Sequence, residues 1–119
     1  MLDHKTILIV EDEAMIACDL EDVVICHGGE VAALCLDIDT AIAEAREGTF
    51  DAAILDYNIG GRAVHEVAEI LRRRGIPFVF NTAIGQRDDL TARYGPVEVC
   101  RKPVKDQELV GALARALAG

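Results

Sequence analysis

The stretch Ile7-Leu8-Ile9-Val10-Glu11-Asp12 decides the fold of this chain. An apolar run without strict alternation ends in two carboxylates, and such a run suits a strand that is covered on both faces, as in a parallel sheet. In open α/β sheets, ligands bind outside the carboxyl ends of the strands. We therefore expect Glu11 and Asp12 to lie at the functional edge of the sheet.

Five apolar runs of strand length occur along the chain, namely Thr6 to Val10, Glu30 to Leu36, Ala52 to Leu55, Phe78 to Phe80 and Val97 to Cys100. Segments with helical periodicity separate these runs, which predicts five strand-helix units. Gly28-Gly29, Gly48 and Gly75 predict the ends of the first three helices, because glycine accepts the left-handed conformation just past a helix. We expect the short, polar fourth helix, from about Gln86 to Tyr94, to be irregular or mobile.

Length and composition limit the classes of protein to which this chain can belong. With 119 residues, we expect a single domain over residues 1–119, and a hydrophobic content of 51% is enough for one core. The balance of 12 Lys and Arg against 21 Asp and Glu gives a charge of −9, which disfavours nucleic acid and anionic membranes as partners.

The cysteines and the hydropathy indicate a compartment. The four cysteines form no Cys-x-x-Cys pair, so we expect buried, reduced thiols. No apolar stretch reaches 18 residues, and the default expectation is a cytoplasmic protein.

Polar residues follow or end the other runs as well. Asp56 follows Ala52 to Leu55, and the sequence then places Asn58, Thr82 and Lys102 at or near strand ends. Glu11, Asp12 and Asp56 would bring three carboxylates together, and their mutual repulsion favours a divalent cation. An oxygen-only site with room for water and phosphate oxygens suits Mg²⁺, with the backbone carbonyl of Asn58 as a further ligand.

Asp56 is the predicted nucleophile, because its buried strand would hold the carboxylate rigidly. A carboxylate can carry a phosphoryl group as an acyl phosphate, and transfer depends mostly on placement and opposite charge. Mg²⁺, Lys102 and the Thr82 hydroxyl would supply these. Taken singly, each of these residues also fits an ordinary helix cap, turn, loop hydroxyl or surface amine. The prediction of a phosphoryl-accepting site therefore depends on their occurring together, at the ends of successive strands.

At this point a family resemblance is evident. Four segments resemble the receiver domains of two-component response regulators: Ile-Leu-Ile-Val-Glu-Asp-Glu at 7–13, Ile-Leu-Asp-Tyr-Asn-Ile at 54–59, Asn-Thr-Ala at 81–83 and Arg-Lys-Pro at 101–103. The resemblance covers essentially the whole chain. It implies a flavodoxin-like (βα)5 three-layer sandwich, with a five-stranded parallel sheet in the order 2-1-3-4-5. It also implies a cis peptide between Lys102 and Pro103.

Carried over by position, Asp56 resembles the phosphoacceptor, and Glu11 and Asp12 resemble the acidic metal-binding pair. Thr82 resembles the switch hydroxyl, and Lys102 resembles the phosphoryl-binding lysine. The resemblance implies a single-domain receiver that takes a phosphoryl group from a sensor histidine kinase and relays it, or the signal, to a downstream protein. Its catalysis would be limited to its own phosphorylation and dephosphorylation.

Two residues differ from the family pattern at positions that take part in its conformational switch. Phe80 and Thr82 match a subgroup marked by Phe-Ala-Thr-Gly-any-Tyr, whose kinases are often of the His-Trp-Glu type, whereas Gly85 replaces the tyrosine. Val99 replaces the usual aromatic residue of the last strand. The resemblance therefore puts a rotating aromatic switch in doubt, and we expect a partner to read the surface from Ile84 to Val99.

Three alternatives stand beside this interpretation. A pseudo-receiver would use the fold only for interaction. A haloacid-dehalogenase-like phosphatase would carry its nucleophile on the first strand, and a flavodoxin-like cofactor binder would need a less acidic first turn. Among other residues, we expect His65 to lie on a helix surface, Asp37 and Asp39 to serve a loop and a helix cap, and Gly60-Gly61 to bind no nucleotide.

Overall fold

A computed structural model describes residues 2–83 and 87–119 of the chain. The elements in order are β1 (Thr6–Val10), α1 (Ala14–Cys26), β2 (Glu30–Cys35), α2 (Ile38–Glu47), β3 (Ala52–Leu55), β4 (Asn58–Ile59), β5 (Arg62–Ala63), α3 (His65–Arg74), β6 (Phe78–Thr82), α4 (Arg87–Tyr94), β7 (Glu98–Arg101) and α5 (Asp106–Ala118). Ile84, Gly85 and Gln86, which belong to the predicted partner surface and fourth helix, lie outside the described residues.

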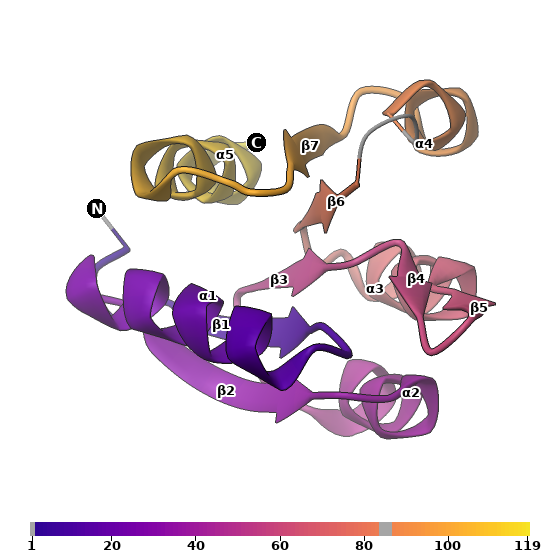
Figure 1. Cartoon of the computed structure of the whole chain (residues 1–119), viewed down its shortest axis with the longest axis horizontal. Helices are drawn as coiled ribbons and strands as arrows, with labels where there is room; N and C mark the ends of the chain where they lie inside the picture. Colours follow the sequence, from indigo (N-terminus) through magenta and orange to yellow (C-terminus); the bar gives the residue numbers. More distant parts are fainter. Residues whose placement is uncertain (1, 84–86) are drawn as a thin grey trace.

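The central sheet has five parallel strands in the order β2-β1-β3-β6-β7. Strands β4 and β5 form a separate antiparallel hairpin. Counted without this hairpin, the order is 2-1-3-4-5, which confirms the predicted flavodoxin-like fold. Helices α1 and α5 cover one face of the sheet, and α2, α3 and α4 cover the other (Figure 1).

The first strand shows why its sequence does not alternate. Leu8 and Val10 pack into the core beneath α2, α3 and α4, whereas Ile7 and Ile9 pack into the core beneath α1 and α5. All four side chains are fully buried. Because both faces of a parallel sheet are covered by helices, every position of a central strand needs an apolar side chain.

Several local expectations are confirmed. Helices α2 and α3 end directly before Gly48 and Gly75, and α1 ends at Cys26, two residues before Gly28. Gly28 and Gly75 have the expected left-handed conformation, with φ 90° and 73°, whereas Gly48 is extended, with φ −72°. The helix expected to begin near Thr40 begins at Ile38 instead, and Asp39 lies in its first turn. Its N-cap is therefore Asp37, whose side chain accepts a hydrogen bond of 2.7 Å from the Thr40 N–H. The peptide between Lys102 and Pro103 is cis.

Other expectations are wrong. Cys18 and Cys26 are exposed on α1, and only Cys35 and Cys100 are buried, so the thiols are free but not all enclosed. The described part of the fourth helix, Arg87–Tyr94, is a regular α-helix of eight residues and not an irregular segment, whereas its mobility stays a prediction. Leu90 and Tyr94 of this helix are both buried in the core beneath α2, α3 and α4.

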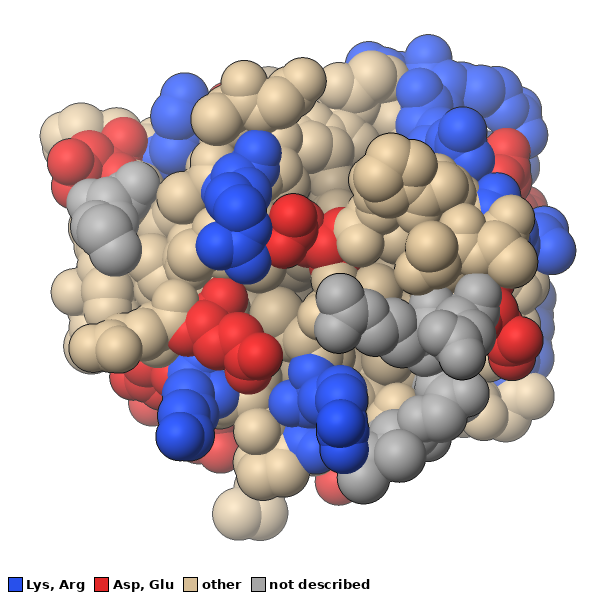
Figure 2. Space-filling model, turned by 90° about the horizontal axis from the view of Figure 1, so that it is seen from above, with Lys and Arg blue, Asp and Glu red and all other residues tan. Residues whose placement is uncertain are grey.

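The net negative charge is not spread evenly over the surface. The face formed by α5, β7 and α4 carries acidic and basic side chains next to one another, and basic side chains gather at one corner (Figure 2). The net charge therefore disfavours anionic partners for the molecule as a whole, but not for every face of it. In the described residues, no helix has the length and apolar character needed to cross a bilayer.

Candidate functional site at the carboxyl edge of the sheet

Backbone hydrogen bonds fix the ends of neighbouring strands against one another. The Glu11 N–H donates to the Cys35 carbonyl at 3.0 Å, and the Asp56 N–H donates to the Val10 carbonyl at 3.0 Å. The Lys102 N–H donates to the carbonyl of Thr82 at 2.9 Å. The residues that follow the strands therefore start from one edge, as parallel topology requires.

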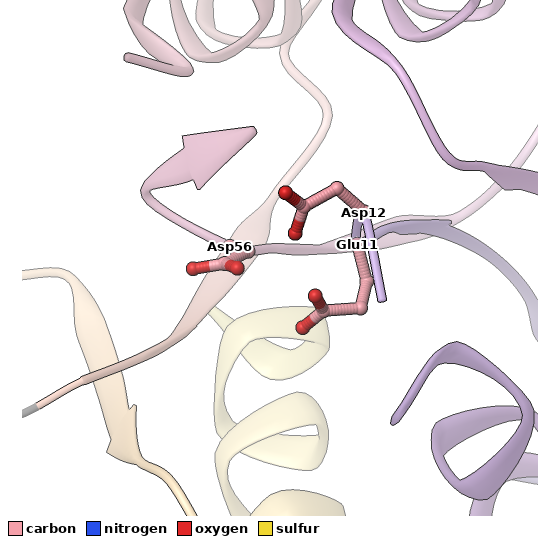
Figure 3. Close-up of side chains that lie close together, drawn as sticks. All are labelled: Glu11, Asp12 and Asp56. Carbon is pink, nitrogen blue, oxygen red and sulfur yellow. The ribbon is translucent and has the colours of Figure 1, made fainter. Parts of the chain in front are cut away.

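Glu11, Asp12 and Asp56 converge at this edge. One carboxylate oxygen from each lies within 4.8 Å of the others. Figure 3 shows the three side chains extending into a common space from the ends of β1 and β3. At such separations two negative charges repel by roughly 3 to 4 kcal/mol at an effective dielectric of about 20. The cluster therefore needs nearby positive charge.

Lys102 supplies one positive charge. Its Nζ lies 2.9 Å from Asp56 Oδ2, with hydrogen-bond geometry, and 2.7 Å from Glu11 Oε1. The second contact has the distance of an ion pair, but no hydrogen bond of good geometry reaches Glu11 Oε1 from the residues that the structure describes. Three ionised carboxylates and one ammonium leave a net charge of two negative units (−3 + 1 = −2).

Burial affects the ionisation of this cluster. Burial raises the pKa of Glu11, although the contacts with Lys102 and the Glu13 N–H oppose the increase, and the charge of Asp56 adds to it. Burial alone would lower the pKa of Lys102, but its contacts with Glu11 and Asp56 are together stronger and raise it. Lys102 is therefore held as an ammonium beside the two carboxylates.

The hairpin β4–β5 closes one side of the site. The Gly60 N–H donates to Asp12 Oδ2 at 2.9 Å, and Arg62 pairs with Asp39 at 3.3 Å. Gly60 and Gly61 both have positive φ, of 58° and 85°, which allows the tight turn at the hairpin tip. This hairpin was not predicted from the sequence, and it fixes one oxygen of Asp12.

The residues present fit a magnesium ion. The donor set consists of oxygens only, the three carboxylates are already close together, and a divalent cation would match their excess charge. Glu11, Asp12 and Asp56 would hold the ion. Asn58 lies in β4, two residues beyond Asp56, where its carbonyl could serve as a further ligand.

The other predicted residues lie at the same edge. Thr82 is the last residue of β6 and is buried, with 1% of its surface exposed. It is therefore not the ordinary loop hydroxyl that the sequence alone would also allow. Of the predicted site residues, the structure brings Glu11, Asp12 and Asp56 together, and Lys102 contacts Glu11 and Asp56. The roles of Asn58 and Thr82 stay predictions.

A groove opens on the other side of the site, between α1 and α5. It encloses about 560 Å³ and includes Lys102 and Pro103 at one end. Apolar side chains line it, and Asp19, Asp22 and Asp106 add negative charge. Asn81 also lines it, buried and with no hydrogen-bond partner for Oδ1 among the described residues.

His65 was misjudged from the sequence. It is the first residue of α3 and is partly buried, with ring contacts to Tyr57 and Tyr94. Tyr94 lies 29 residues further along the chain, so no local pattern around His65 indicates this contact. The residue types alone gave one indication of this contact, because histidine and tyrosine side chains usually form a hydrogen bond when they are buried.

Comparisons with known proteins agree with this geometry. The chain is 39% identical to SdrG from Sphingomonas melonis Fr1, whose solution structure it matches with a TM-score of 0.83, covering 98% of both chains. It matches the receiver domain of the PhyR response regulator from Erythrobacter litoralis with a TM-score of 0.85 at 24% identity, covering 98% of this chain and 92% of that one.

Among curated proteins, the chain is 29% identical to the transcriptional regulatory protein PdtaR of Mycobacterium tuberculosis over 117 residues. That alignment covers 96% of this chain but only 57% of PdtaR. No protein-family model matches the chain. The fold, the strand-end site and the relatives together identify the class: the chain belongs to the receiver domains of response regulators.

One neighbour bears on the metal. The receiver domain of the sensor histidine kinase PA1611 from Pseudomonas aeruginosa PAO1 was solved with a magnesium ion coordinated in its active-site cleft. It shares 24% identity with this chain and a TM-score of 0.83, covering 98% of this chain and 99% of that one. At that identity the likeness concerns the fold.

Proposed function

We propose that this receiver domain accepts a phosphoryl group from a sensor histidine kinase on Asp56, with Mg²⁺, and relays the signal to a protein partner. The observation that carries the proposal is the contact of 2.9 Å between Lys102 Nζ and Asp56 Oδ2, beside Glu11 and Asp12. A buried carboxylate next to one ammonium and two further carboxylates is an arrangement that phosphoryl transfer can use.

Asp56 would act as the nucleophile. One of its carboxylate oxygens forms a bond to phosphorus while the nitrogen–phosphorus bond of a phosphohistidine on the kinase breaks. The electron pair stays on the departing imidazole, which takes up a proton. The product is an acyl phosphate on Asp56. The position of Asp56 directly after the fully buried strand β3 would hold the attacking oxygen in place.

Lys102 would stabilise the transferred group. Its ammonium contacts two carboxylates in the present structure and can exchange one of these contacts for a phosphoryl oxygen. Thr82, at the end of the adjacent strand β6, would donate its hydroxyl to another phosphoryl oxygen. Mg²⁺, held by Glu11, Asp12, Asp56 and the Asn58 carbonyl, would neutralise charge on the phosphoryl oxygens.

The donor would approach from the side of α1 and α5. The hairpin β4–β5 closes the opposite side through the bond from Gly60 to Asp12, whereas the groove between α1 and α5 leads to Lys102. Apolar lining with acidic side chains fits a helical partner surface that combines apolar and basic side chains. Two further parts of the proposal are the relay to a downstream protein and a kinase of the His-Trp-Glu type. Only the family resemblance supports them.

The proposal is tested by the intact mass of the protein after incubation with acetyl phosphate and Mg²⁺. We expect the mass of one phosphoryl group to be added to the parent and to Asp39→Asn, a matched change of an exposed aspartate near the site. Asp56→Asn should gain nothing. A parent that also gains nothing would favour a pseudo-receiver, and a gain on Asp56→Asn would assign the acceptor to another residue.

A further inference from the structure

A histidine joins the loop after Asp56 to the end of α4. The Tyr94 hydroxyl lies 2.6 Å from His65 Nδ1, and the Tyr57 hydroxyl lies 3.3 Å from His65 Nε2. These three residues form what we call the Tyr57–His65–Tyr94 bridge. They come from three segments, because Tyr57 directly follows Asp56, His65 begins α3 and Tyr94 ends α4.

The hydrogen bonds of the bridge suit a neutral imidazole. A neutral ring offers one acceptor and one donor, and each phenol can do either. The shorter contact assigns an O–H donated by Tyr94 to Nδ1, which leaves the proton on Nε2 to donate to the Tyr57 oxygen. Both ring nitrogens of His65 are then used, and His65 connects the two tyrosines through one hydrogen bond to each.

Each end of the bridge is firmly anchored. The Tyr94 ring packs against Phe80 at 5.5 Å and Phe78 at 5.9 Å between centroids, and Tyr94 is only 8% exposed. At the other end, the Tyr57 carbonyl accepts a hydrogen bond of 2.8 Å from the Val64 N–H, just before α3. The Tyr94 ring is therefore held by the core, and at the other end the Tyr57 backbone is held while its half-buried ring packs against the edge of the same core.

Tyr94 provides a side-chain connection between α4 and the site. Val99 of β7 packs against the same core but has no side-chain group that can form a hydrogen bond. The hydroxyl of Tyr94, in contrast, connects through His65 to Tyr57, the residue next to Asp56.

We propose that His65 is a positioning residue that couples the state of Asp56 to the position of α4 through the Tyr57–His65–Tyr94 bridge. The phosphoryl part of this inference rests on the proposed function. When the Asp56 side chain acquires a phosphoryl group, the backbone at Tyr57 shifts, and the two hydrogen bonds carry that shift to the end of α4. Coupling of this kind needs a contact that differs between the unmodified and the phosphorylated protein. The 3.3 Å hydrogen bond between Tyr57 and His65 can provide it, because it can shorten or break.

The test measures backbone amide resonances in ¹⁵N-labelled protein. Tyr94→Phe removes the hydroxyl and keeps the ring in the core, and Tyr57→Phe does the same at the other end. His65→Leu removes both hydrogen bonds. His27→Leu is the control, because it makes the same residue change at a histidine outside the bridge: His27 forms one local hydrogen bond, to the Val23 carbonyl at 2.8 Å, at the end of α1.

The first arm needs no phosphoryl group. Tyr94→Phe should move the amide resonances of Tyr57 and Asn58, and Tyr57→Phe should move those of Leu90 to Gly95, whereas His27→Leu should move neither set. If Tyr94→Phe leaves Tyr57 and Asn58 unmoved, the bridge transmits nothing and the inference is overturned. Because this arm uses the unmodified protein, its result does not depend on the proposed function.

The second arm adds beryllofluoride and Mg²⁺ as a phosphoryl mimic. In the parent we expect shifts at Thr82 and Lys102 and also in α4. In Tyr94→Phe and His65→Leu the shifts at Thr82 and Lys102 should persist, while those in α4 fall by at least about half. Undiminished α4 shifts in both variants would overturn the inference. No response at all in the parent, together with a positive first arm, would reject the proposed function and leave only the mechanical coupling.

Discussion

The ammonium of Lys102 lies 2.9 Å from Asp56 and 2.7 Å from Glu11, and so connects the carboxyl end of β7 with those of β3 and β1. The side chain of Lys102 is 20% exposed and those of its partners 10% and 1%, so solvent screens the pairs incompletely. This ammonium occupies the position beside the carboxylates that a metal ion or a phosphoryl group would have to share. Its removal should therefore affect metal binding and stability in opposite directions.

Lys102→Met should bind Mg²⁺ more tightly than the parent. Without the ammonium, the three carboxylates carry a larger excess of negative charge, and relief of only about 1.4 kcal/mol of repulsion between Lys102 and the ion gives tenfold tighter binding. The measurement is a titration of the protein with Mg²⁺ followed by the amide resonances of the site. Lys105→Met, an exposed lysine nearby, should leave the affinity unchanged.

The same variant should be less stable in the absence of divalent ions. Glu11 and Asp56 would be left as partly buried carboxylates without a counter-charge, and we expect a loss of about 1 to 3 kcal/mol in the free energy of unfolding. Urea unfolding in the presence of a chelator measures this loss. Equal stability, or weaker Mg²⁺ binding, would mean that Lys102 does not neutralise the cluster.

Mg²⁺ should stabilise the parent protein, because an ion that binds only the folded state raises the free energy of unfolding as its concentration rises. Asp12→Asn should weaken Mg²⁺ binding at least about tenfold, since it removes a charged ligand. The asparagine can still accept the Gly60 N–H, so the hairpin should remain in place. Thermal unfolding with and without Mg²⁺ provides the readout.

Asp19→Asn is the control for that experiment. It removes the same charge from an exposed position on α1, outside the carboxylate cluster. If both variants lose the stabilisation by Mg²⁺ equally, the ion responds to the overall charge and not to this site.

Asp37→Ala should lower the free energy of unfolding by about 1 kcal/mol, because it removes the N-cap of α2 and its bond of 2.7 Å to the Thr40 N–H. Asp37→Asn keeps an acceptor and should lose less. Asp39→Ala removes an exposed ion pair with Arg62 and an acidic side chain from the first turn of α2, but no capping hydrogen bond, and should have a smaller effect than Asp37→Ala. Urea midpoints that rank the three variants differently would contradict the capping role.

Acidification should destabilise the protein partly through His65. Burial lowers the pKa of His65, the charge of Arg93 lowers it further, and Glu69 opposes both. The unfolded state, with an ordinary pKa of about 6.5, therefore binds more protons than the folded state as the pH falls below that value. The stability contributed by the neutral ring is fully present above about pH 6.5 and is lost as the pH falls through the folded pKa.

Urea unfolding at pH 7.5 and pH 5.5 checks this sign. The parent should lose more stability between these conditions than His65→Phe, which cannot take up the proton. Asp37 and Asp51, whose pKa values are lowered by bonds to the Thr40 and Thr6 backbone, contribute to both proteins alike. An equal loss in parent and variant would mean that His65 titrates as it does in the unfolded chain.

The sequence predicts the parts of this protein that depend on local pattern and parallel topology. The run before Glu11 must be a strand covered on both faces, and parallel strands bring Glu11, Asp56 and Lys102 to one edge wherever their helices lie. The site was therefore predictable as a set of residues before any distance was known.

Contacts between distant segments were not predictable in this way. The bond from Gly60 to Asp12 joins residues 48 apart, and the bond from Tyr94 to His65 joins residues 29 apart. Each depends on how a loop or helix packs, which apolar periodicity does not specify. The exposure of Cys18 has the same origin, because it depends on which face of α1 meets the sheet.

The central claim is that Asp56 is a phosphoryl acceptor flanked by Lys102, Thr82 and a metal site, and the most direct measurement is an experimental structure of the protein with beryllofluoride and Mg²⁺. The account predicts beryllium bonded to an oxygen of Asp56, fluorides in contact with Lys102 Nζ and the Thr82 hydroxyl, and Mg²⁺ bound by Glu11, Asp12, Asp56 and the Asn58 carbonyl. Beryllofluoride on another residue, or Asp56 left unmodified with both reagents in excess, would contradict it.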